Sequence, residues 1–126
     1  MDPTPKSESA GTYTPDNLIA GDFPLVTVQV TIASGAGAQP RGAVLGKVTA
    51  TGKYIRSLSA ASDGSETPRA ILAQDVDATS GDVVATAYIK GEFNERALTI
   101  GTGHTADSIR DALADKGIIL RKSVAK

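Results

Sequence analysis

The sequence predicts a mainly β protein with one short helix. Residues 25–33 alternate apolar and polar side chains, with Val26, Val28 and Val30 on one face, which is the period-two pattern of a strand. Further short apolar segments follow, separated by turns that contain Gly or Ser. A helical apolar spacing is clear only in residues 106–116. A chain of 126 residues with this pattern predicts a single domain.

The remaining strands are expected as short segments in chain order. Gly46 interrupts the second of them, and a glycine inside a strand indicates a bulge or the close approach of another backbone segment. The predicted strands after the first are residues 43–49, 53–58, 69–73, 83–90, 97–100 and 118–121, and the predicted loops and turns are residues 34–42, 50–52, 62–65 and 79–82.

The helix has recognisable signals at both ends. Thr105 is a suitable N-cap, and Asp107 suits the positive end of the helix dipole. Ile109 and Leu113 lie one turn apart and predict a narrow apolar face. Gly117 fits the left-handed position at which helices commonly end.

Small residues dominate the composition, with 19 Ala, 13 Gly, 13 Thr and 10 Ser among 126 residues. Aromatic residues make up only 4% of the chain. Because burial contributes roughly 25 cal/mol per Å² of apolar surface, a core of Ala and Val leaves a small margin of stability. The composition therefore favours a domain that gains stability from oligomerisation.

Charge and cysteine content exclude several functional classes. A net charge of −1 gives no basic field that would attract nucleic acid. The chain has no cysteine, which excludes disulfide scaffolds, thiolate metal sites and cysteine catalysis. Neither a membrane-spanning apolar stretch nor the apolar core of a signal peptide is visible, so we expect a soluble protein that is intracellular at synthesis.

Residues 1–17 form a polar, proline-containing segment that we expect to be a flexible arm, with the β-rich domain spanning residues 18–126. Taken alone, such a segment is as readily a mobile terminus. Apolar side chains nevertheless gather where it joins the domain, and an arm with anchors can become ordered on a partner. These residues are Tyr13, Leu18, Ile19, Phe23 and Pro24.

Two glycine-rich segments lack the context of a phosphate-binding loop. Residues 35–42 lie between two predicted strands, whereas a dinucleotide loop needs a helix N-terminus. Residues 101–105 do precede the helix, but they lack the spacing and the Lys of a P-loop. Both segments are therefore interpreted as connections.

The titratable residues form no catalytic or metal-binding pattern. His104 is the only histidine, and it is expected in a loop near the start of the helix. The acids at positions 75, 77 and 82 do not follow the spacing of a calcium loop and are interpreted as solvated turn residues. Glu92 and Glu95 are expected to have a structural or interface role. No catalytic residue, metal or cofactor is predicted.

Several segments, in this order and spacing, resemble the lambda-type bacteriophage head decoration proteins. The resemblance runs from about residue 13 to residue 122, and no single motif in it is chemically diagnostic. The segments that carry it are Tyr13–Pro24, Arg41–Lys47, Ser62–Pro68, Ala70–Leu72 and Gly91–Glu95.

The resemblance implies a β-clip-type domain that forms a homotrimer. It implies a cement protein that binds the major capsid protein on the outside of the expanded head, at threefold and quasi-threefold positions, and stabilises it against the pressure of the packaged DNA. The protein would be made in the host cytoplasm and located in the virion. Alternative hypotheses are another virion module, such as a tail or fibre protein, and a dUTPase-like nucleotide hydrolase on a similar scaffold.

In that family the arm becomes ordered on the capsid and adds a strand to it. Ordering each residue costs roughly 1–2 kcal/mol of backbone entropy, so one arm should bind weakly, and three arms on one trimer should bind by avidity. Side chains at alternate positions of an added strand provide specificity. The residues expected to contact the capsid are Tyr13, Thr14, Pro15, Leu18, Ile19, Phe23 and Pro24.

Overall fold

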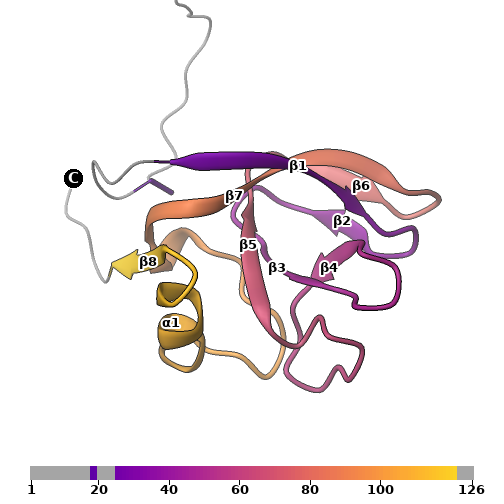
Figure 1. Ribbon diagram of the computed structural model, residues 1–126. Coiled ribbons are helices and arrows are strands. Elements are labelled where there is room, and N and C mark those ends of the chain that lie inside the picture. The colour runs from indigo at the N-terminus through magenta and orange to yellow at the C-terminus, as the bar shows by residue number, and fades with distance from the viewer. Residues whose placement is uncertain (1–17, 20–24, 122–126) are drawn as a thin grey trace, which may run out of the picture.

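The computed structural model describes residues 18–19 and 25–121 and is mainly β with one α-helix (Figure 1). The fold class predicted from the sequence is therefore confirmed. The elements are β1 (Val26–Ile32), β2 (Gly37–Gln39), β3 (Val44–Lys47), β4 (Tyr54–Arg56), β5 (Pro68–Leu72), β6 (Val76–Ala78), β7 (Val83–Asn94), the 3-10 helix η1 (Glu95–Ala97), α1 (Ala106–Ala114) and β8 (Ile118–Arg121).

Five strands form a closed ring. Their order is β1-β4-β3-β5-β7, and β7 pairs again with β1 to complete the circuit, while β8 continues the sheet beyond β7. The β1–β7 contact is a long antiparallel pairing that runs from Val26↔Lys90 to Ile32↔Val83. The β1–β4 contact consists of one parallel pair, Ile32↔Tyr54. The ring is therefore firmly joined on one side of β1 and barely joined on the other.

The interior of this barrel is lined mainly by small side chains. A barrel of few strands encloses little space, and eight strands already leave only enough room for side chains to fill. Small residues therefore fit this interior, where five of the 19 alanines are buried. The buried interior residues are Val30, Ile32, Ala43, Leu45, Ala70, Leu72, Ala78, Ala85 and Ala87.

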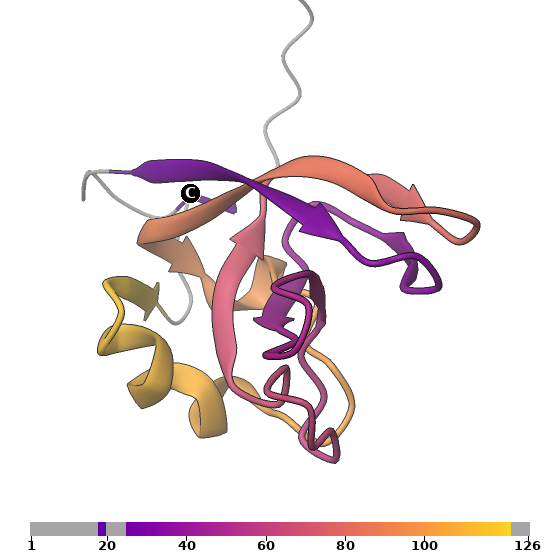
Figure 2. The same ribbon diagram turned by 45° about the vertical axis from the view of Figure 1, so that its right-hand side comes forward.

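A second core lies between the outside of the barrel and the elements α1 and β8 (Figure 2). Strand β8 pairs in parallel with the second half of β7, from Gly91↔Ile118 to Asn94↔Arg121. Larger side chains gather here because two layers pack face to face rather than around a narrow axis. The buried residues are Leu18, Val44, Ile71, Phe93, Ile109, Leu113, Ile118 and Leu120.

The ends of α1 confirm the predicted helix signals. The Ser108 amide donates to the Thr105 hydroxyl at 3.1 Å, and the Thr105 amide donates to the Ser108 hydroxyl at 2.8 Å, which is a reciprocal capping box. Ile109 and Leu113 are buried as expected. The helix ends at Ala114, two residues before the predicted limit, and Gly117 has a φ of +91°.

Three features of the strands differ from the prediction. Strand β7 runs to Asn94, four residues beyond the predicted end at residue 90. Strands β2 and β6 pair with each other inside segments expected to be loop or left unassigned, because three residues without apolar periodicity leave no strand signal. The strand predicted at residues 97–100 is wrong. There, η1 turns the chain away from β7, and only Thr99 is aligned with Ala43 in an isolated bridge.

Gly46 confirms both effects expected of a glycine in this strand. The register between β3 and β5 shifts at Leu45 and Gly46. A Cβ atom on Gly46 would lie 2.0 Å from the backbone oxygen of Ser65, far inside van der Waals contact. The loop that contains Ser65 therefore packs directly on the backbone of β3.

We predict that Gly46→Ala destabilises the protein by about 1–3 kcal/mol, because a side chain at this position forces the β3 and Ser65 backbones apart. Thermal unfolding at fixed protein concentration measures the effect. Gly81→Ala is the matched control, since a Cβ atom there meets nothing within 4 Å, and it should leave the unfolding temperature nearly unchanged. Equal unfolding temperatures for the two variants would contradict the close approach.

Candidate interaction surface

The predicted contact residues Leu18 and Ile19 lie against the end of β7. Ile19 forms an antiparallel bridge with Phe93. The Asn94 amide donates to the Leu18 carbonyl oxygen at 2.8 Å, and the Leu18 side chain is only 2% exposed, within the outer core. The structure therefore fastens these two residues to the body, and the segment that precedes Leu18 joins the fold at the end of β7.

The other predicted contact residues, Tyr13, Thr14, Pro15, Phe23 and Pro24, lie outside the described residues. Their role in binding stays a prediction. The described residues resume at Leu25, directly before β1.

An exposed apolar strip begins at Leu25 and continues along β1. Leu25, Val26 and Val28 are 45%, 40% and 36% exposed, whereas Val30 and Ile32 on the same strand are buried in the barrel. The sequence does not distinguish this strip from the buried part of β1, because apolar and polar residues alternate in the same way in both halves of the strand. Burial along β1 instead depends on where its neighbours end, which the local pattern does not encode.

Comparison with known proteins bears on this surface. Over residues 8–119, the chain matches the family model described as bacteriophage lambda head decoration protein D. The chain belongs to this decoration protein family. The family resemblance predicted from the sequence is therefore confirmed. No curated protein matches the chain at a significant level.

Members of the lambda head decoration family are structural components of the phage head, which is not an enzyme class. Membership therefore implies association with the capsid and a location in the virion. Within residues 18–19 and 25–121, no group of three His, Cys, Asp or Glu side chains is arranged to hold a metal ion. No helix in this part of the chain is long and apolar enough to cross a membrane.

His104 connects three loops of the decoration domain. Its Nε2 atom lies 3.1 Å from the Ser57 hydroxyl and 3.1 Å from the Glu66 carbonyl oxygen. Because a carbonyl oxygen only accepts hydrogen bonds, Nε2 carries a proton. The predicted loop position of His104 is confirmed, and its contact with the fully buried Ser57 indicates a structural role that the sequence did not reveal.

The two glutamates after Gly91 hold the outer layer to the barrel. Glu92 pairs with Arg121 of β8 at 2.9 Å. Glu95 pairs with Arg110 of α1, which also contacts Asp107 at 2.6 Å. The structural role expected for Glu92 and Glu95 is confirmed, since both form ion pairs across elements of the same domain.

The acids at positions 75, 77 and 82 are exposed residues beside turns, as predicted. The Thr79 hydroxyl and amide, which donate to Asp77, lower the pKa of that carboxyl. The Lys53 ammonium and the Ser34 amide, both 2.7 Å from Asp82, likewise lower the pKa of Asp82. The Asp77 bonds stabilise a local turn, whereas the Asp82 bonds join the turn before β7 to Ser34 and Lys53, which are distant in sequence.

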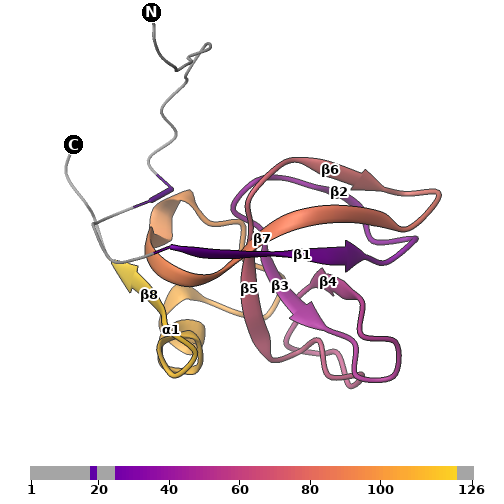
Figure 3. The ribbon, with the colours of Figure 1, turned by 45° about the horizontal axis from the view of Figure 1, so that its top comes forward.

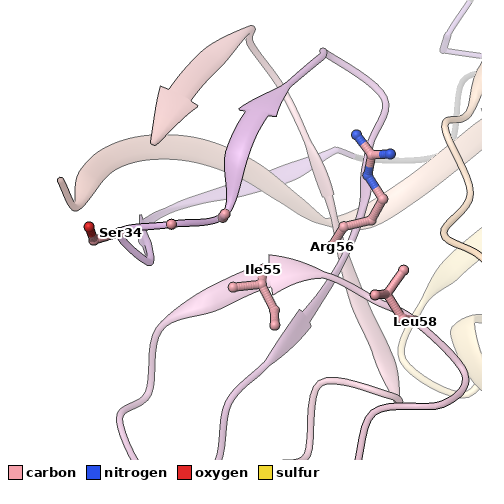
Figure 4. A pocket seen from close by; sticks show the side chains of 6 residues that line it. Ser34, Ile55, Arg56 and Leu58 are labelled. Atoms are coloured by element: carbon pink, nitrogen blue, oxygen red, sulfur yellow. The ribbon is translucent and has the colours of Figure 1, made fainter. Parts of the chain in front are cut away.

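An open pocket of about 380 Å³ lies where β1 and β4 diverge (Figure 4). Its lining is mainly apolar, with Ile55 and Leu58 on one side and the turn after β1 on the other. The single charged group in the lining, Arg56, donates from Nε to Gln39 at 2.9 Å. The pocket therefore presents mainly apolar surface for packing, and the one hydroxyl in its lining, that of Ser34, has no carboxylate or imidazole beside it among the lining residues.

We predict that Leu18→Ala destabilises the domain by about 2–5 kcal/mol, because it removes a buried leucine from the outer core. The control is Leu25→Ala, which truncates a leucine that is 45% exposed and should change stability by only about 0.5 kcal/mol. Denaturant unfolding followed by circular dichroism compares the two. Similar, small effects would mean that Leu18 does not fasten the segment.

The Asp82 interactions predict a dependence of stability on pH. The pKa of Asp82 is lower in the folded state than its ordinary value of 3.8, so its contribution is fully present above that value and is lost as the pH falls through the lowered pKa. We expect Asp82→Asn to lower the unfolding temperature at pH 7, and the difference from the wild type to shrink below pH 4. A difference that stays constant down to pH 2 would exclude this contribution.

Proposed function

We propose that this protein is a head decoration, or cement, protein that binds the expanded capsid from the outside as a homotrimer. It occupies threefold and quasi-threefold positions, contacts the major capsid protein and stabilises the shell against the pressure of the packaged DNA. The observation that carries the proposal is the family match over residues 8–119, which includes the junction between arm and domain. The protein is synthesised in the host cytoplasm and acts without catalysis, a cofactor, direct nucleic-acid contact or a membrane.

Residues 1–17 act as the arm, and residues 18–126 form a β-clip-type domain that presents it. The attachment of Leu18 and Ile19 to β7 supports this division, because it provides a fixed point from which a preceding segment can reach a partner. The contact residues are those expected from the sequence: Tyr13, Thr14 and Pro15 before the fixed point, Ile19 at it, and Phe23 and Pro24 after it. Leu18, whose side chain is buried, contributes by holding the fixed point in place.

The trimer makes weak arms effective. Each arm loses roughly 1–2 kcal/mol of backbone entropy per ordered residue, so a single arm has little net affinity. Three linked arms engage at effective concentrations in the millimolar range, which adds factors of about 10²–10⁴ when all three sites have the correct spacing. Binding therefore selects the expanded shell over the unexpanded one.

The proposal predicts a trimer in solution. Three times the chain mass of 12.9 kDa gives about 38.7 kDa by light scattering after size exclusion. Deleting residues 1–17 makes each chain lighter but should leave the number of chains at three, because the deletion retains Leu18 and Ile19. Cosedimentation with expanded capsids should then show binding weakened roughly 10²-fold, since the avid contacts are lost.

Unexpanded capsids serve as the control for the same experiment and should bind neither form. A strict monomer at high concentration would contradict the trimer. Equal binding of the full-length and truncated proteins would remove the arm from the mechanism.

A further inference from the structure

Among the residues that the structure describes, no strand lies beside one edge of β1 over most of its length. Strand β1 pairs with β7 from Val26 to Ile32, but on its other side it meets β4 only at Ile32. Figures 1 and 3 show the first half of β1 at the periphery of the molecule, away from β4. Residues 26–30 therefore form an open edge of about 17 Å, at 3.4 Å per residue.

The register identifies the backbone groups that face outward. Across from Gln29, the Thr86 carbonyl oxygen accepts from the Ala73 amide at 2.9 Å, and the Thr86 amide donates to the Gln74 side chain. Gln29 and Thr86 therefore form a non-hydrogen-bonded pair, and the amide and carbonyl of Gln29 point away from β7. The same alternation turns the backbone groups of Thr27 outward, while Val28 and Val30 bond to β7.

The side chains of this edge are those of a strand that is normally covered. The sequence of β1, VTVQVTI, has neither a charge nor a proline, and Val26 and Val28 are exposed. Its pairing with β7 shifts register between Val26 and Thr27 and is regular from Thr27 to Ile32. Proteins usually protect an exposed edge with charges, prolines, bulges or short strands, because an unprotected edge pairs with other chains. Strands β2, β4 and β6 have only three residues each, whereas β1 has seven.

We infer that an extended segment of the major capsid protein pairs with the open edge of β1 and adds a strand beside it. This inference rests on the proposed function. The partner segment carries apolar side chains that cover Val26 and Val28 on one face. Hydrogen bonds to Thr27 and Gln29 supply the backbone part of the interaction.

Two observations favour the capsid over a second copy of this chain. Direct pairing of one β1 edge with the same edge of another copy generates a twofold axis, which does not build a trimer, so a second copy could pair here only through a different edge. The edge is also continuous with the arm junction, because Leu25 follows the predicted contact residues and Ile19 and Val26 both lie beside residues 90–93 of β7. The arm and the β1 edge can therefore contact one continuous surface.

The test is Gln29→Pro, with Gln29→Ala as the matched control. Proline removes the outward amide and no bond to β7, and it is tolerated on the open edge of a strand. Both variants lose the 3.0 Å bond between the Gln29 side chain and Thr86, so they differ in the backbone group and its added ring. We expect both to unfold at similar temperatures and to keep the wild-type oligomeric mass. Binding to expanded capsids should fall roughly tenfold or more for Gln29→Pro alone.

Each outcome decides one hypothesis. Wild-type affinity of Gln29→Pro for capsids would overturn pairing at this edge and leave the proposed function intact. A reduced oligomeric mass of Gln29→Pro would overturn the inference that the capsid protein pairs with this edge, and would show that a neighbouring copy of the chain pairs with it instead. Failure of the wild-type protein to bind capsids would instead contradict the proposed function. If Gln29→Pro does not fold, Thr27→Lys places a charge on the same edge, and the same loss of binding is expected, with unchanged binding overturning the inference.

Discussion

Backbone hydrogen bonding along β7 connects every layer of this domain. Its first part closes the barrel against β1, its middle pairs with β5, and its second part carries β8 and the bridge to Ile19. The two cores meet along this one strand, because alternate side chains of β7 point to opposite faces. Ala87 thus lies in the barrel interior while Tyr88 packs against the outer core. The same strand also positions the candidate surface, because Ile19 and β1 both pair with β7.

Barrel size explains a composition that first suggests a weakly stable protein. A narrow interior accepts alanine and valine without leaving voids, so small residues are a requirement of the closed ring and not a shortage of apolar material. Ile32, Leu45 and Leu72 are the larger residues of the interior, and other large apolar residues lie in the outer core and in the exposed strip at Leu25, Val26 and Val28. Part of the apolar surface that another domain would bury internally is therefore displayed on a structural protein of the phage head.

The sequence predicted those elements that are determined by residues close together along the chain. The alternation of residues 25–33, the capping residue Thr105 and the interruption at Gly46 each depend on neighbours along the chain, and each was confirmed. Strands β2 and β6 escaped prediction because their pairing with each other, and not their composition, makes them strands. At the site, Leu18 and Ile19 stood out as apolar residues beside a polar segment. Their partner Phe93 and the exposure of Val28 depend on contacts distant in sequence, which no local pattern contains.

The attachment of Leu18 and Ile19 also has a mechanical consequence. Tension applied through the chain ahead of Leu18 enters the fold at Phe93 and Asn94, on the strand that all the layers share. In the described part of the chain, that connection includes a bridge, a backbone hydrogen bond and one buried leucine, whereas β1 and β7 are joined along seven residue pairs. A load on the arm should therefore detach this junction before it opens the barrel. The contacts of Leu18 and Ile19 with β7 would break first, so that a domain pulled from its partner stays folded and can bind again.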